Sequence, residues 1–148
     1  MTAPIVLAVT REIAAPPERV FDAWLDPAQA GQFLFRTDEG ELVACEIDAR
    51  VGGRATIVER RGGVDARHRL KFEEIDRPRR LVMLFSADPA AESEWTRVTI
   101  TLAPSGAGST LTLTHEMAPQ WAEYEDRTRE GWTMILGNLA RILERHHG

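Results

Sequence analysis

The sequence predicts an α+β domain in which a curved, seven-stranded antiparallel sheet surrounds a long C-terminal helix, with two short helices after the first strand. Three observations predict it. Apolar residues alternate with a period of two through most of the chain, two proline-led segments interrupt this alternation near residue 20, and helical spacing returns after Pro119. Because a twisted sheet must bury one face, and only the last helix is large enough to cover it, the two are expected to pack together.

The first strand is predicted over residues 5–13, where apolar residues recur at alternate positions. Pro16 and Pro17 end this strand, and proline is tolerated in the first turn of a helix because its missing N–H has no partner there. A short amphipathic helix follows. Asp26 then provides an N-cap with Pro27 at the first helical position, which predicts a second short helix after a sharp corner.

Alternation with a period of two predicts six further strands, over residues 42–48, 54–60, 64–75, 80–86, 95–102 and 109–117. Turn residues separate them: Gly52-Gly53, Gly62-Gly63, Arg77-Pro78, the loop Asp88-Pro89-Ala90-Ala91, and residues 104–108. The Gly62-Gly63 pair is typical of a tight hairpin, and such a turn would pair residue 57 with residue 68.

The last element is a long amphipathic helix in which Trp132, Leu136 and Leu139 recur on one face. Gly131 and Gly137 lie inside it, and each costs about 1 kcal/mol of helix stability relative to alanine. Glycines in such positions are typical of close approach to a neighbour, here the sheet or a ligand.

Composition is that of one soluble globular domain over residues 1–148, with 43% hydrophobic and 28% charged residues. The net charge of −5 argues against a nucleic-acid partner. No apolar run approaches the roughly 20 residues that span a bilayer, so no membrane partner is expected. The single cysteine, Cys45, excludes an internal disulfide, and a cytoplasmic protein is expected.

Several segments combine with this order of elements to indicate a family. They are residues 13–24, 47–54, 72–82 and 110–116, and Gly131-Trp132 with Leu136 and Leu139. Together they resemble the helix-grip proteins of the START and birch-pollen-allergen type, the SRPBCC superfamily. The branch is the one named for homologues of the activator of the 90-kDa heat-shock protein ATPase. That branch usually has a Trp-Trp-Gly-Pro-like run where this chain has Phe33-Leu34-Phe35-Arg36-Thr37.

The resemblance implies a helix-grip fold with a ligand cavity between the sheet and the terminal helix, and no obligatory cofactor. Members bind lipids, polyketides and other apolar molecules. A chaperone partner is less favoured, because the named eukaryotic activators have an additional domain for which this chain has no room.

Two histidines are candidate ligand-binding residues because they lie in phase with apolar neighbours on their strands. His68 alternates with Leu70 and Phe72, and His115 alternates with Leu113. Each is either a cavity-lining group or a core histidine whose hydrogen bonds are satisfied. A metal site is not expected, because no third ligand stands at a convincing spacing.

Glu59 is the third polar candidate. It is in phase with Ile57, and the predicted hairpin would place it diagonally opposite His68. A carboxylate and an imidazole in an apolar cavity could serve as an acid–base pair. The alternative is that Glu59 extends into solvent near the turn.

Aromatic and methionine side chains complete the predicted ligand contacts: Trp132 on the helix, Phe33 and Phe35 near the cavity mouth, and Met83 and Phe85 on the fifth strand. The alternative for all five is ordinary core packing. A basic stripe on one hairpin is interpreted as a solvated face. It comprises Arg54, Arg60, Arg61, Arg67 and Arg69.

Three functions remain open at this point. The leading hypothesis is binding of a small hydrophobic or amphipathic ligand in the cavity. The second is a cyclase-, dehydratase- or hydrolase-like enzyme using the same cavity. The third is a protein partner, either a chaperone or a second copy of this chain in a homodimer. No nucleophile elbow, phosphate-binding loop or dinucleotide fingerprint occurs in the sequence.

Overall fold

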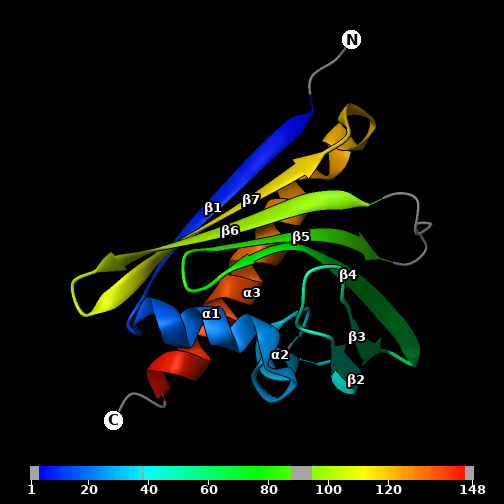
Figure 1. Ribbon diagram of the computed structural model, residues 1–148. Helices are drawn as coiled ribbons and strands as arrows, with labels where there is room; N and C mark the ends of the chain where they lie inside the picture. The colour runs from blue at the N-terminus through cyan, green and yellow to red at the C-terminus, as the bar shows by residue number, and fades with distance from the viewer. Residues whose placement is uncertain (1–3, 38, 88–94, 146–148) are drawn as a thin grey trace.

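The computed structural model describes residues 4–37, 39–87 and 95–145. In this part of the chain the seven strands form one sheet in the order β1-β7-β6-β5-β4-β3-β2, and all neighbours are antiparallel (Figure 1). The strands are β1 Ile5–Ile13, β2 Glu41–Ile47, β3 Arg54–Arg61, β4 Val64–Asp76, β5 Arg80–Ala87, β6 Thr96–Ser105 and β7 Gly108–Met117. The helices are α1 Pro17–Leu25, α2 Pro27–Phe33, the 3-10 helix η1 Pro119–Tyr124 and α3 Glu125–Arg145. The predicted fold class is confirmed.

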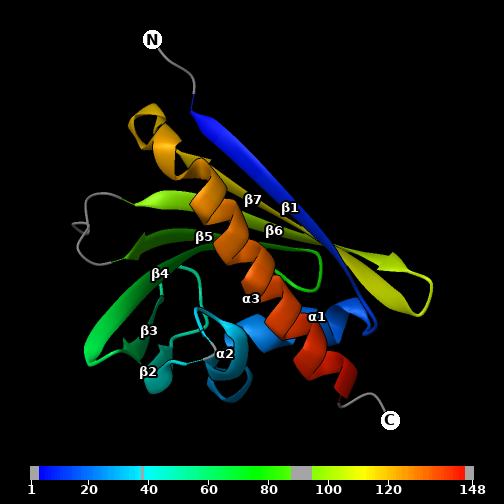
Figure 2. The ribbon, with the colours of Figure 1, turned by 180° about the vertical axis from the view of Figure 1, so that it is seen from behind.

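The curved sheet surrounds α3, which runs diagonally across its inner face (Figure 2). The short helices α1 and α2 lie beside the C-terminal half of α3 and close that end of the fold. On β7 every second side chain is buried, from Ser109 to Met117, as the alternation predicted. Leu136 and Leu139 of α3 are buried in the same core. The space between the sheet and α3 is therefore the interior of the molecule.

Two of the sharp turns lie where local sequence signals predicted them. The Asp26 side chain accepts a hydrogen bond from the Ala28 backbone N–H at 3.1 Å and caps α2, with Pro27 at its first position. Gly62 and Gly63 both adopt positive φ, which glycine tolerates and a two-residue hairpin turn requires. The resulting register pairs Ile57 with His68, as predicted.

Two details differ from the sequence-based expectation, and one prediction is not tested. The 3-10 helix η1 precedes α3, whereas the pattern did not separate the two. Strands β6 and β7 extend to Ser105 and from Gly108, so most of the segment predicted as a hairpin loop belongs to the strands. The predicted loop Asp88-Pro89-Ala90-Ala91 lies outside the described residues.

The predicted close approach of the sheet to Gly131 and Gly137 is wrong, because a Cβ atom added at either would meet no atom within 4 Å outside the neighbouring helix backbone. We therefore expect Gly131→Ala and Gly137→Ala each to raise the free energy of unfolding by about 1 kcal/mol, through helix propensity alone. Urea denaturation measures the change. Gly40→Ala is the control and should destabilise, since its Cβ would collide with the Glu59 carboxylate. A loss of stability at positions 131 and 137 would show that these glycines are needed for packing.

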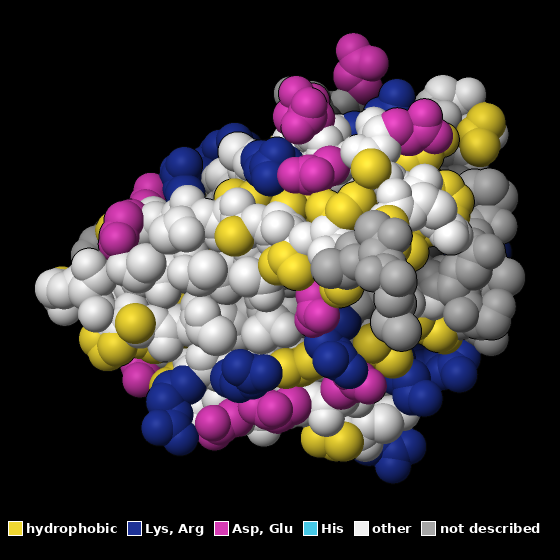
Figure 3. All heavy atoms as spheres, turned by 90° about the horizontal axis from the view of Figure 1, so that it is seen from above, with side chains coloured by type: hydrophobic (Ala, Val, Ile, Leu, Met, Phe, Trp, Pro, Cys, Tyr) yellow, Lys and Arg dark blue, Asp and Glu magenta, His cyan; other side chains and the backbone are white. Residues whose placement is uncertain are grey.

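On the face drawn in Figure 3, acidic and basic side chains are mixed around a largely uncharged centre. No broad patch of one sign forms on this face. Within the part of the chain that the structure describes, no helix is long and apolar enough to cross a membrane.

Candidate functional site

Five ring-bearing side chains from five different elements meet between the sheet and α3. This ring cluster consists of Phe35, His68, Phe85, His115 and Trp132. Phe35 follows α2, the next three lie on β4, β5 and β7, and Trp132 lies on α3. The strand residues point inward because each shares the phase of the buried positions on its strand, which confirms the predicted orientation of both histidines.

His115 is held by a continuous chain of hydrogen bonds. Trp132 Nε1, which can only donate, bonds to His115 Nδ1 at 3.0 Å. A neutral imidazole then carries its hydrogen on Nε2, which lies 2.7 Å from Thr96 Oγ1. The Thr96 hydroxyl in turn donates to the Phe85 carbonyl at 3.3 Å. Every hydrogen-bonding position of the ring is used.

Burial also fixes the charge of His115. The side chain is 3% exposed, and burial lowers its pKa to about 4. His115 is therefore neutral at neutral pH and acts as a rigid link between β7 and α3. This matches the core-histidine alternative of the sequence analysis, although the residue also forms a wall of the ring cluster.

Phe35 contacts three of the other four rings, and Phe85 contacts all four. The Phe35 ring stacks on His68 with centroids 4.2 Å apart and planes 3° apart. The centroids of Phe85 and Trp132 lie at 5.2 Å and 5.6 Å from it. The side chain is 6% exposed, and its backbone has a φ of 55°, a left-handed conformation that is uncommon outside glycine. Packing of the ring among its neighbours thus keeps a strained backbone conformation at Phe35.

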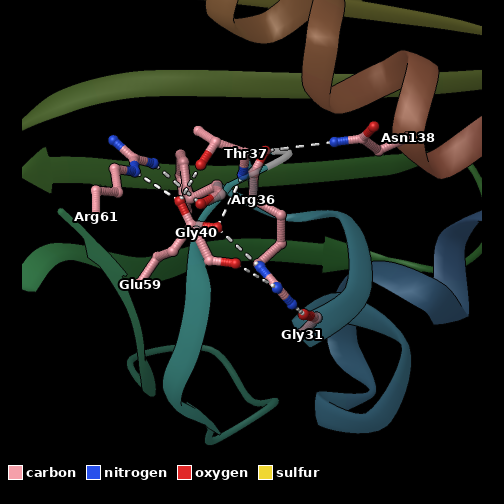
Figure 4. Close-up of polar contacts among 8 residues, drawn as sticks. Gly31, Arg36, Thr37, Gly40, Glu59, Arg61 and Asn138 are labelled. Atoms are coloured by element: carbon pink, nitrogen blue, oxygen red, sulfur yellow. Dashed lines mark hydrogen bonds and ion pairs between the residues drawn. The ribbon is translucent and has the colours of Figure 1, made fainter.

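Glu59 is fully buried, so the alternative of a solvent-exposed side chain is wrong. Its carboxylate accepts four hydrogen bonds from three residues of the surrounding loop and strand (Figure 4). Arg61 Nε lies at 2.6 Å and Arg36 Nε at 3.0 Å, while the backbone N–H and the hydroxyl of Thr37 both lie at 2.8 Å. We call these four residues the Glu59 network.

The network keeps the carboxylate ionised. Burial raises the pKa of Glu59, but the hydrogen bonds from Arg61, Thr37 and Arg36 together lower it further, to about 2. Two guanidinium groups compensate the buried charge. Glu59 is diagonal to His68 in the register, as predicted, but its oxygens are directed to the loop after α2.

The network also anchors the loop that contains Phe35. Arg61 Nη2 donates to the Phe35 carbonyl at 3.1 Å, and Arg36 Nη1 donates to the Gly31 carbonyl at 2.7 Å. Asn138 of α3 donates to the Arg36 carbonyl at 3.4 Å. The backbone on both sides of Phe35 is therefore tied to α2, β3 and α3.

Two predicted contact residues are buried but are not members of the ring cluster. Met83 is fully buried on the inner face of β5, two residues before Phe85. Phe33 is fully buried at the end of α2, where its ring meets Trp24 edge-on at 5.1 Å.

One residue of the predicted basic stripe has a role that the sequence analysis did not assign to it. The Arg61 side chain is exposed, as a solvated face predicts, but it also pairs with Glu59 in the Glu59 network. Its phase with Glu59, two residues earlier on the same strand, was the signal that could have shown this. Arg36, Thr37 and Thr96 were missed, because the first two lie in an irregular loop and the third at the start of a strand.

A separate surface hollow of about 310 Å³ lies at the opposite end of β7 from His115. It is lined by Glu12, Ile13, Ala14, Ser105, Gly108 and Glu144. No member of the ring cluster lines it. Among the described residues, no group of three or more His, Cys, Asp or Glu side chains is placed to hold a metal ion.

Comparison with known proteins decides the family. The family model described as "Activator of Hsp90 ATPase homolog 1-like protein" matches residues 14–144. The chain belongs to this family. This confirms the resemblance seen in the sequence and the helix-grip fold that came with it. No curated protein sequence matches the chain.

Solved structures agree with the assignment. A protein from Chromobacterium violaceum is 28% identical with a TM-score of 0.81, over 94% of this chain and 96% of that one. An Hsp90 activator from Plasmodium falciparum is 25% identical with a TM-score of 0.73, over 95% and 96% of the two chains. A protein from Nitrosomonas europaea, 21% identical with a TM-score of 0.82 over 95% of each chain, shares the fold.

Proposed function

We propose that this family member binds a small apolar or amphipathic molecule between the sheet and α3, with the ring cluster as its contact surface. One observation carries the proposal: five rings, two of them imidazoles, converge from five elements on the inner face of the sheet. Small-molecule sites are typically lined by apolar and aromatic side chains with a few fixed polar groups. Met83 extends this apolar lining along β5.

The two histidines have different roles in this proposal. His68 is partly exposed, so it is the polar group that a ligand reaches first. His115 is buried and bonded on both nitrogens, so it sets the position of Trp132. We do not place Glu59 in contact with the ligand. Its role in this proposal is to hold the loop that contains Phe35.

A fluorescent apolar probe tests the proposal. We expect 1-anilinonaphthalene-8-sulfonate to bind the folded protein, and Trp132→Leu to weaken binding by about tenfold, the loss of about one aromatic contact. Trp121→Leu is the matched control, because Trp121 lies in η1 outside the ring cluster. Native mass spectrometry of protein purified from its own host should also reveal a retained molecule. Equal binding by wild type and both variants would place the probe elsewhere and contradict the proposal.

An acid–base enzyme has less support. A general acid must hold a proton at the working pH, and Glu59 with a pKa of about 2 does not. The ionised carboxylate is also a weak general base, because its low pKa disfavours taking up a proton and its oxygens already accept four hydrogen bonds. All four of its hydrogen bonds are also needed by the loop. We therefore favour binding over catalysis by Glu59 and His68.

The family supports a second candidate function, which is an interaction with the 90-kDa heat-shock protein. The observation behind it is the family description together with the similarity to the Plasmodium falciparum activator. The test adds this protein to the purified chaperone and measures ATP hydrolysis. Stimulation would support the interaction, whereas an unchanged rate and no complex in a pull-down would exclude it.

A further inference from the structure

We propose that Phe35 occupies the ligand position in the ring cluster, and that the matching ligand is a flat aromatic molecule of one or two rings that displaces the Phe35 side chain and stacks on His68. This inference rests on the proposed function and names its ligand class. It also assigns Phe35 the role of a built-in competitor for the site.

The shape of the position indicates a flat ligand. The Phe35 ring stacks on His68 with centroids 4.2 Å apart and planes 3° apart, so a group that replaces it on the imidazole face must be flat to make the same contact. Phe85 lies beside both rings, with its centroid 5.2 Å from Phe35 and 6.3 Å from His68. Trp132 is tilted by 57° and limits the position from the side of α3. Offset stacking and edge contacts of this kind favour aromatic rings over saturated rings of the same size.

The backbone of Phe35 indicates that the ring can be displaced. A φ of 55° is unfavourable for phenylalanine, and burial of the ring among its neighbours is what offsets the strain. When another ring takes over the stacking on His68, the peptide plane between Leu34 and Phe35 can rotate, which returns the Phe35 φ to an ordinary value without moving the chain on either side. Relief of strain then offsets part of the contact energy that Phe35 loses.

The frame around Phe35 is fixed, which confines the change to this residue. Leu34 is fully buried and its N–H bonds to the Ala30 carbonyl at 2.8 Å. On the other side, Thr37 is bonded twice to the Glu59 carboxylate. We therefore expect the Phe35 side chain to swing while the loop on both sides stays anchored.

Phe33 provides the contrast that a test needs. Both phenylalanines are buried and only two residues apart, but Phe33 lies in α2 with an ordinary helical backbone and packs against Trp24. Truncating either ring makes room in the core. Only truncation of Phe35 should also remove a competitor from the ligand position.

The experiment measures indole binding by titration calorimetry in wild type, Phe35→Ala, Phe35→Gly and Phe33→Ala. Wild type should bind weakly, because only the minor fraction of molecules with Phe35 displaced is competent. With an open fraction of about one in ten, Phe35→Ala should bind about tenfold more tightly. Phe35→Gly should do the same and fold more readily, since glycine tolerates the positive φ. Phe33→Ala should bind as wild type does.

Two further measurements sharpen the result. Cyclohexanol is of similar size but is not flat, and it should bind less tightly than indole to every form. NMR of wild type with indole should show the Phe35 ring signals shifting as the stack on His68 is lost. Thermal melting checks that each variant is folded before it is titrated.

The outcomes separate this inference from the proposed function. If indole binds Phe35→Ala but not wild type, it fills a cavity that the substitution itself creates. If Phe33→Ala gains as much affinity for indole as Phe35→Ala, the gain comes from truncating any buried ring and not from the ligand position. Either result overturns the inference. If 1-anilinonaphthalene-8-sulfonate binding depends on Trp132 while Phe35→Ala leaves indole and probe affinity unchanged, the inference is wrong and the proposed function stands. If neither compound binds any form, both are wrong.

Discussion

Replacing Glu59 by alanine should lower the free energy of unfolding by about 3–5 kcal/mol, the usual cost of breaking a buried ion pair by removing one partner. The reason is that two arginines and the N–H and hydroxyl of Thr37 lose their shared acceptor at once. Urea denaturation at pH 7 measures the loss. Glu59→Gln should lose less, because an amide oxygen still accepts from part of the network.

Glu73→Ala is the matched control. Glu73 pairs with Arg97 at 3.2 Å on the outer face of the same sheet, where both side chains are partly exposed. Exposed pairs of this kind contribute about 0–1 kcal/mol. Similar losses for Glu59→Ala and Glu73→Ala would show that the Glu59 network adds no more stability than a surface pair.

A double-mutant cycle measures how much of the stabilisation comes from the interaction between Arg61 and Glu59. Arg61→Ala and Glu59→Ala should be strongly non-additive, because each removes the same 2.6 Å contact. Arg61 also bonds to the Phe35 carbonyl, so its loss should loosen the loop as well. Additive losses in the cycle would argue that the two side chains stabilise the fold independently.

The regular part of the fold could be predicted from the sequence because strand geometry repeats every two residues. This period alone predicted that His68 and His115 point inward, and the glycine pair at the hairpin predicted that His68 pairs with Ile57 of β3. The residues on the inner face of the sheet could therefore be predicted from the sequence. The same rule, applied to residues 57, 59 and 61, would also have placed Arg61 on the same side of β3 as Glu59.

The rest of the site depends on contacts that no local pattern encodes. Thr37 meets Glu59 from 22 residues away, and Asn138 meets the Arg36 carbonyl from 102 residues away. The loop between α2 and β2 has no period, so the sequence indicated neither the positive φ of Phe35 nor its stacking on His68. Such positions are set by tertiary packing, which overrides local preference.

Stability should fall by about 2 kcal/mol when the pH is lowered from 7 to 5, and His115 should account for this loss. Burial lowers its pKa to about 4 in the folded protein, whereas an unfolded histidine has a pKa near 6.5. Between these values the unfolded chain binds the proton and the folded chain does not. Acid therefore favours unfolding throughout this window. Urea denaturation at several pH values measures the slope.

His115→Phe removes the titrating group and should flatten that slope between pH 7 and 5, even though it leaves Trp132 Nε1 without its acceptor and lowers stability overall. The window of Glu59 is separate, because its pKa falls from 4.5 to about 2 on folding and its contribution is lost only below pH 4.5. An unchanged slope in His115→Phe would mean that another group takes up the proton. The hydrogen-bonded chain from Trp132 to Phe85 would then not keep His115 neutral, and its part in holding α3 against β7 would need a different explanation.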